Sequence, residues 1–173
     1  MPTSYQAHLR GDVDTEKTVS QSSDSNVAKD TATVSKLLEG KGGDIISIRP
    51  QDTIAAAVTI LRDKRIGALV VTDAGGALQG ILSERDIVRK LAETPGQTLP
   101  QKVEDNMTRE VMTCSPDENL VTVLRRMNEG RFRHLPVVDD GRLCGMVTIG
   151  DVVSYRLNEL EYEALQLKQM IVG

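Results

Sequence analysis

Apolar and polar positions along this 173-residue chain form two blocks with the same pattern. In the later block, residues 135–138 and 143–147 are mostly apolar runs, and the Asp-Gly pair at 140–141 between them is a strong signal for a hairpin turn. Thr148 then precedes Asp151 by three residues, which is the spacing of a capping box at a helix start. The pattern predicts a strand, a tight turn, a second strand and a capped helix.

The earlier block, residues 66–86, matches this one position by position. Three pairs stand 66 residues apart: Leu69 and Leu135, Val71 and Val137, Asp73 and Asp139. After a difference of one residue in the turn, three more stand 65 apart: Gly80 and Gly145, Ser83 and Thr148, Asp86 and Asp151. A duplication is the economical explanation for self-similarity at a fixed period.

Helical and strand periodicities extend each copy backwards and predict the order β-α-β-β-α twice. In the first copy we expect a strand at 45–48, a helix capped by Asp52 or Thr53, a hairpin at 67–72 and 77–82, and a helix over 84–92. In the second copy we expect a strand at 111–114, a helix over 119–128, the hairpin already described, and a helix from Ile149.

The domain organisation follows from these elements and from shifts in composition. Residues 1–33 are polar and lack either period, so they are interpreted as a flexible N-terminal tail. The first repeat is assigned to 34–93, a linker to 94–104, the second repeat to 105–158 and a C-terminal helix extension to 159–173. Each repeat alone is short for a stable core, so we expect the two to bury their sheet faces together.

The last predicted helix continues to about Met170, with Leu, Val and Met interspersed among Glu and Lys. A helix of that length exceeds what its own repeat can cover. We therefore expect it to reach a neighbouring subunit, because exposed apolar stripes mark interfaces. The alternative is that it folds back on its own sheet.

Composition narrows the function classes. The net charge of −4 and the absence of a long basic cluster argue against nucleic acid as the main partner. Apolar runs are of strand length and the N-terminus lacks an apolar core, so we expect no membrane insertion, no signal peptide and a cytoplasmic protein. Cys114 and Cys144 lack ligand-type spacing and are interpreted as small buried hydrophobic residues.

The two copies resemble a tandem pair of CBS domains, the module named after cystathionine β-synthase and called a Bateman module when paired. The residues that carry the resemblance are Ala-Leu-Val-Val at 68–71, His-Leu-Pro-Val-Val at 134–138, and Gly-hydrophobic-hydrophobic-[Ser/Thr]-x-x-Asp at 80–86 and 145–151. The resemblance covers roughly residues 34–160 and is similar to the stand-alone bacterial type. It implies an α+β fold, with two β-α-β-β-α CBS repeats packed with pseudo-two-fold symmetry and a long C-terminal helix.

The resemblance also implies a set of ligand contacts. Asp86 and Asp151 would accept hydrogen bonds from ribose hydroxyls, as a carboxylate can from two vicinal O–H donors. Ser83 and Thr148 lie at the same helix N-termini, which suit a phosphate group. The loops before the first strands would line the adenine: Gly43, Asp44 and Ile45 facing Asp151, and Arg109, Glu110 and Val111 facing Asp86.

The two copies differ in the basic residues available for phosphate. The second has Arg131, Arg133 and His134 before its hairpin, where the first has Arg65, Gly67 and Ala68. Arg133 and His134 are therefore the expected phosphate partners, with Arg85 adding positive charge to the first site. The alternative is a solvated basic edge before a strand.

We expect a non-catalytic regulatory module that binds an adenine nucleotide and acts through ligand-dependent packing of its repeats and subunits. Such modules bind AMP, ADP, ATP, NAD(H) or S-adenosylmethionine, and the basic cluster leaves a mononucleotide and a dinucleotide open. A homodimer and a regulated partner protein of unknown identity follow from the same resemblance. With no catalytic triad, metal cluster or Walker-type loop, neither an enzyme nor a catalytic cofactor is expected. The alternative function is a ligand-independent interaction scaffold.

Overall fold

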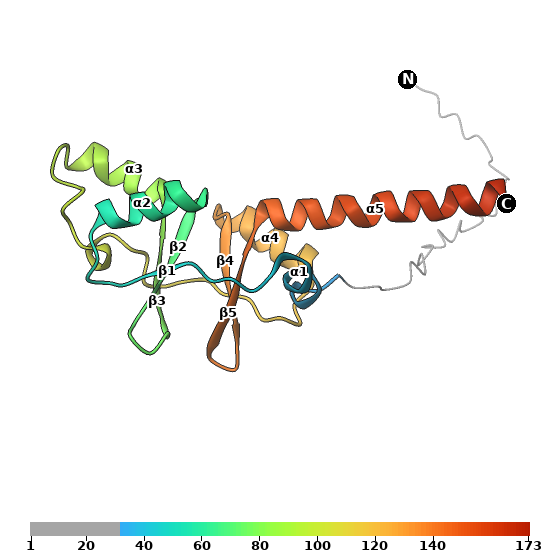
Figure 1. The fold of residues 1–173 in the computed structure, drawn as a ribbon, viewed down its shortest axis with the longest axis horizontal. Coiled ribbons are helices and arrows are strands. Elements are labelled where there is room, and N and C mark those ends of the chain that lie inside the picture. The colour runs from blue at the N-terminus through green and yellow to red at the C-terminus, as the bar shows by residue number, and fades with distance from the viewer. Residues whose placement is uncertain (1–31) are drawn as a thin grey trace, which may run out of the picture. The chain divides into compact units, whose positions relative to one another are not determined.

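The structure, a computed structural model, describes residues 32–173. The tail predicted at 1–33 therefore lies almost wholly outside the described residues. The elements of the described part, in chain order, are α1 (Val34–Lys41), β1 (Ser47–Ile48), α2 (Ile54–Lys64), β2 (Ala68–Thr72), β3 (Leu78–Ser83), α3 (Glu84–Glu93), the short 3-10 helix η1 (Val103–Asp105), α4 (Leu120–Gly130), β4 (His134–Asp139), β5 (Arg142–Thr148) and α5 (Ile149–Val172). They form two similar halves, each a small sheet covered by helices (Figure 1).

The first half contains β1, β2 and β3, with β1 parallel to β2 and β2 antiparallel to β3. Thr53 caps α2, because its hydroxyl oxygen accepts a hydrogen bond from the Ala56 N–H at 3.2 Å. Helical spacing places Ile54, Ala57 and Leu61 on the buried face of α2. The predicted helix cap and hairpin of this half are confirmed, and the predicted strand at 45–48 is shorter, at two residues.

The second half contains the antiparallel pair β4 and β5 with α4 and α5. Asp140 and Gly141 link the strands with φ angles of 47° and 76°, as a type I′ turn requires. Asn119 caps α4 by accepting from the Val121 N–H at 2.7 Å. The hairpin and the helix predicted here from sequence are confirmed.

The strand predicted at 111–114 is wrong except at its last residue. Cys114 alone bridges β4, donating to the Pro136 carbonyl at 3.0 Å. On either side of it the backbone bonds to side chains instead: the Thr113 carbonyl accepts from Arg126 at 3.3 Å, and the Ser115 N–H donates to Glu118 at 2.9 Å. The ladder cannot continue in either direction, because its next bonds would need the N–H groups of residues 116 and 136, and both residues are proline.

The segments before each sheet are exchanged between the halves. Val34 and Leu37 of α1 belong to the core of the second half, although α1 precedes the first half in sequence. Val103 of η1 likewise belongs to the core of the first half. Residues 42–46 and 106–113 therefore cross between the halves in opposite directions (Figure 1). Each core is completed by a segment from beside the other, so we expect the halves to fold as one unit.

The last helix, α5, is 24 residues long and ends at Val172, which confirms the predicted long C-terminal helix. Its first turns pack on the second core through Ile149, Val152 and Tyr155. From residue 160 onward every residue of the chain is exposed. Among the residues that the structure describes, no helix combines the length and the apolar character needed to cross a membrane. Contact of α5 with a neighbouring subunit stays a prediction.

Candidate functional site

Asp86 and Asp151 occupy equivalent places, the third residue of the helix that directly follows a strand. Each forms a capping box: the carboxylate accepts from the N–H of Ser83 or Thr148 at 2.9 Å, and the hydroxyl of that residue accepts from the aspartate N–H. Ser83 also donates its hydroxyl hydrogen to Asp86 at 2.6 Å. The matched motif therefore fixes two carboxylates at two helix N-termini.

Each carboxylate keeps one oxygen free of these bonds. Within residues 32–173, the hydrogen bonds to Asp86 and to Asp151 all fall on Oδ2. Oδ1 of each can therefore accept a donor from outside, and both side chains are only half-buried. Carboxylates held in this way suit a ligand that presents hydroxyl donors.

The two aspartates differ in their cationic partners. Lys41, the last residue of α1, places its Nζ 2.6 Å from Oδ2 of Asp151 and 2.9 Å from the Met146 carbonyl oxygen. Asp86 forms no ion pair with any described residue. Burial by itself would raise the pKa of Asp151, but hydrogen bonds from Lys41 and from the Thr148 N–H lower it below its ordinary value.

Lys41 was not among the residues singled out from sequence. It directly precedes the Gly-Gly pair of the loop that was expected to face Asp151, and its position beside that loop was the only available signal. Gly43, Asp44 and Ile45 follow Lys41 in the segment that crosses to the first half. The structure thus brings the start of this loop to Asp151.

Residues Arg85 and Gly67 of the first half contact Arg131 and His134 of the second, and we call this place the junction of the halves. Arg85 of α3 donates from Nη1 to the Arg131 carbonyl oxygen at 3.0 Å. The ring of His134 lies against Gly67, where a Cβ atom would stand 3.1 Å from Cε1 of the histidine. Arg131 and Arg133 are exposed and His134 is half-buried, so the basic residues predicted from the second copy gather at this junction.

Charged groups of both halves affect the pKa of His134. Burial lowers the pKa of His134 below its ordinary value, and Lys41 and Arg133 act in the same direction. Glu84 of the first half and Asp151 of the second oppose them. His134 therefore favours its neutral form, in which it can donate or accept one hydrogen bond.

Arg109 and Asp86 line different hollows of the first half. Arg109 lines a hollow of about 310 Å³ at the turn end of β2 and β3, together with Asp73 and Gln79. Asp86 lines a smaller hollow of about 220 Å³ with Arg89, Lys90, Glu93, Asp105 and Asn106. Thr108 pairs with Ile81 in antiparallel fashion, so the chain from Thr108 through Glu110 to Val111 runs away from Asp86. The grouping of Arg109, Glu110 and Val111 with Asp86 around one ligand stays a prediction.

The two thiols lie in different surroundings. Burial raises the pKa of Cys114 to about 12, and Glu118 adds to this effect. Cys144 is half-buried, and its thiol donates to the Val137 carbonyl oxygen at 3.3 Å. Within residues 32–173 no group of three His, Cys, Asp or Glu residues could hold a metal ion.

Comparison with known proteins fits both the duplication and the geometry. The sequence profile of the family described as "CBS domain" matches twice, over residues 42–93 and 102–158. The chain belongs to the CBS domain family. Its two halves are the two CBS repeats, as the resemblance implied.

Several known proteins and solved structures are similar to this CBS pair over most of its length. "CBS domain-containing protein CBSX3, mitochondrial" from Arabidopsis thaliana is 34% identical over 152 residues, which cover 83% of this chain and 74% of that protein. The chain spans 41%, 43% and 63% of the length of three further curated relatives. The crystal structure of the CBS-domain-containing protein ATU1752 from Agrobacterium tumefaciens is 41% identical with a TM-score of 0.71, covering 72% of this chain and 99% of that one.

One similar structure contains ligands. The CBS domain pair of protein MJ0100, in complex with 5′-methylthioadenosine and S-adenosyl-L-methionine, is 29% identical with a TM-score of 0.66. The match covers 75% of this chain and 98% of that one. A CBS pair of this architecture thus binds adenosine-containing molecules.

Proposed function

We propose that this CBS pair is a non-catalytic regulatory module that binds an adenine nucleotide, AMP, ATP or NAD(H), at the junction of its repeats. The observation that carries the proposal is the pair of capping-box aspartates at two helix N-termini, each with an Oδ1 that accepts no hydrogen bond from residues 32–173. A ribose diol offers two O–H donors to such an oxygen, and the helix N-terminus favours a nearby phosphate. The adenosine ligands of the MJ0100 pair support the nucleoside part.

The basic residues at the junction are the proposed phosphate-binding residues. The exposed guanidinium of Arg133 can bind two phosphate oxygens at once, and neutral His134 can donate one hydrogen bond. Lys41 and Arg131 add positive charge beside them. Gly43, Asp44 and Ile45 are the proposed adenine-lining residues, since their segment begins at Asp151.

Regulation follows if the ligand binds one arrangement of the repeats better than another. The junction contacts, Arg85 with Arg131 and His134 with Gly67, are those that a ligand there would change. We propose that the module acts in the cytoplasm as a homodimer on a partner protein.

The test is thermal unfolding with AMP, ATP, NADH and S-adenosylmethionine added separately. A ligand at one hundred times its Kd stabilises the folded state by about 2.7 kcal/mol, a shift that the melting temperature reports. The double variant Asp86→Asn and Asp151→Asn should abolish the shift, because the amide keeps the cap acceptor and removes the charge. Asp63→Asn is the control, since Asp63 is exposed on α2 and, among the described residues, forms an ion pair only with Arg62. A shift with none of the four, or one that survives in the double variant, contradicts the proposal.

One observation favours the alternative of a ligand-independent scaffold. Lys41 already pairs with Oδ2 of Asp151, so the charge of that carboxylate is balanced without a ligand. A scaffold predicts the same oligomer and the same partner binding whether or not nucleotide is present. Sedimentation of the wild-type protein with and without the stabilising nucleotide separates the two functions.

A further inference from the structure

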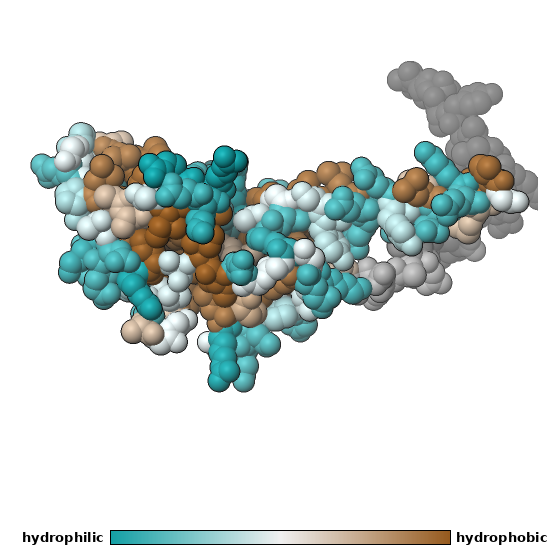
Figure 2. All heavy atoms as spheres, viewed as in Figure 1, coloured by the Kyte–Doolittle hydropathy of each residue, from teal (hydrophilic) through white to brown (hydrophobic). Residues whose placement is uncertain are grey.

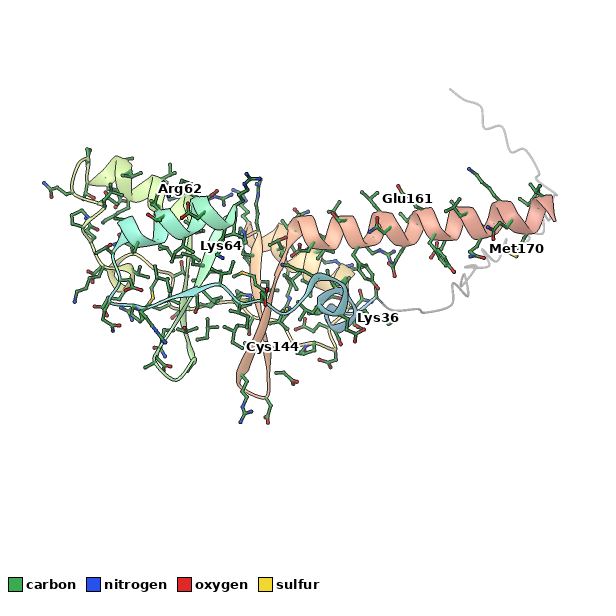
Figure 3. The ribbon with its side chains drawn as sticks, in the orientation of Figure 1. Lys36, Arg62, Lys64, Cys144, Glu161 and Met170 are labelled. Atoms are coloured by element: carbon green, nitrogen blue, oxygen red, sulfur yellow. The ribbon has the colours of Figure 1, made fainter. Side chains whose placement is uncertain are left out.

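The outer part of α5 presents an apolar stripe that the CBS repeats do not cover. Ile149, Val152 and Tyr155 form the inner face of α5, on the core of the second repeat. Apolar residues on the rest of the helix are exposed among polar ones, as Figure 2 shows along α5. Figure 3 labels Glu161 and Met170 on this outer part. An uncovered stripe on a helix of this length indicates a helical partner.

The spacing of the stripe identifies the kind of packing. Its members follow each other at alternating intervals of four and three residues: Val153, Leu157, Leu160, Ala164, Leu167 and Ile171. We call these six residues the outer stripe. Their mean period of 3.5 residues is that of a left-handed coiled coil, in which Leu157, Ala164 and Ile171 take one core position and Val153, Leu160 and Leu167 the other. Leu157, Leu160 and Leu167 are 54%, 53% and 57% exposed.

The charges beside the outer stripe fit a second copy of the same helix in parallel orientation. The relevant core position is the one taken by Leu157, Ala164 and Ile171. In a parallel pair, the residue just before this position on one helix faces the residue five places later in sequence on the other helix. This rule places Arg156 opposite Glu161 and Glu163 opposite Lys168, two pairs of opposite charge. In an antiparallel pair with full overlap, Glu161 would face Glu161 and Glu163 would face Glu163. The flanking charges favour the parallel pair and oppose the antiparallel one.

We propose that residues 153–171 of two chains form a parallel, two-stranded coiled coil. The occupant of the outer stripe is thus a second copy of this chain. The inference rests on the dimer of the proposed function and not on nucleotide binding, so each can fail without the other.

The first experiment compares two leucines of equal exposure in the full-length protein. Leu167 lies in the outer stripe and Leu165 lies outside it, and both are 57% exposed. Leu167→Glu should raise the dimer Kd by roughly tenfold or more, because it places two like charges in the contact. Leu165→Glu should leave the dimer Kd unchanged. Sedimentation equilibrium measures both, and thermal unfolding with the stabilising nucleotide checks that binding is retained.

The second experiment fixes the orientation by cross-linking. In the parallel pair residue 160 faces residue 160 of the other chain, so Leu160→Cys alone should form a disulfide-linked dimer on mild oxidation. In the antiparallel pair residue 160 faces residue 164, and only a mixture of Leu160→Cys and Ala164→Cys would link efficiently. The wild-type protein, with Cys114 and Cys144, is the background control. The proposal is overturned by a monomeric wild-type protein, by equal effects of Leu165→Glu and Leu167→Glu, or by linkage only in the mixture.

Discussion

Lys41 and Asp151, 110 residues apart in sequence, form an ion pair in which Nζ stands 2.6 Å from Oδ2. The pair joins the end of α1 to the first turn of α5 and stands at the start of the segment that crosses to the first repeat. Asp86, the equivalent aspartate, has no such partner among the described residues. The two carboxylates of the duplication are therefore chemically different, and a ligand would meet a paired acid on one side and an unpaired acid on the other.

Replacing Lys41 should change the titration of Asp151. Lys41→Met removes a hydrogen bond and a positive charge that lower the pKa of Asp151, so that pKa should rise. The free energy of unfolding at neutral pH should fall by less than about 1 kcal/mol, because the pair is partly exposed. NMR titration of the carboxylate carbons and urea unfolding measure the two effects.

The pH dependence of this pair has a defined sign. The folded pKa of Asp151 lies below that of the unfolded chain, about 3.9, so its contribution is present above that value and is lost as pH falls through the folded pKa. The difference in stability between wild type and Lys41→Met should therefore shrink in acid. Lys102→Met is the control, because Lys102 pairs with Glu104 at 3.4 Å and does not contact Asp151. An unchanged titration of Asp151 in Lys41→Met would show that the ion pair is not formed in solution.

The local features of this fold could be predicted from sequence because neighbouring residues determine them. The turn at Asp140 and Gly141 and the capping boxes at Asp86 and Asp151 each depend on residues within a few positions. Once two copies were recognised, the same motif located both aspartates. Their contacts with bound ligand, like those of Ser83, Thr148 and the basic residues, remain predictions.

The features that sequence reasoning missed depend on contacts between distant segments. α1 lies on the second repeat because Val34 and Leu37 pack into that core. The local sequence around them does not indicate which of the two cores they join. The reach of Lys41 to Asp151 follows from the same exchange. The strand expected at 111–114 reduces to Cys114 because the next ladder bonds would need N–H groups from Pro116 and Pro136, and this becomes visible only once the pairing of Cys114 with Val137 is known.

His134 should make stability depend on pH near neutrality. Its folded pKa lies below the unfolded value of about 6.5, so the unfolded chain takes up the proton first as pH falls. The contribution of neutral His134 to the free energy of unfolding is therefore complete above the unfolded pKa. It declines as the pH falls from there toward the folded pKa. His134→Gln should therefore flatten the fall in unfolding free energy between about pH 8 and pH 5, measured by urea unfolding. His8, the other histidine, is present in both proteins. Equal slopes in the two proteins would mean that His134 titrates normally.

The duplicated glycines Gly80 and Gly145 provide a matched pair for testing close approach. Both are buried, and they pair with Val71 and Val137 at equivalent points of the two hairpins. A Cβ on Gly145 would stand 2.9 Å from the end of the Leu38 side chain, which can move. A Cβ on Gly80 would stand 2.7 Å from Sδ of Met107, a flexible side chain, and 2.8 Å from the backbone oxygen of Thr108. Thr108 is bonded to Ile81 in both directions, at 2.9 and 3.0 Å, so its backbone cannot retreat without breaking that bridge.

Gly80→Ala should therefore cost more stability than Gly145→Ala. We expect a loss of about 1–3 kcal/mol in the free energy of unfolding for Gly80→Ala, as for other overpacked sites, and less than about 1 kcal/mol for Gly145→Ala. Both glycines have ordinary backbone φ angles, so alanine adds no conformational strain at either. The two sites differ because only at Gly80 is one of the neighbours that must move a backbone atom. Urea unfolding of the two variants beside the wild type measures the difference. A larger loss for Gly145→Ala would contradict this prediction. It would mean that the Thr108 backbone moves more easily than the Leu38 side chain, despite the two hydrogen bonds between Thr108 and Ile81 of β3.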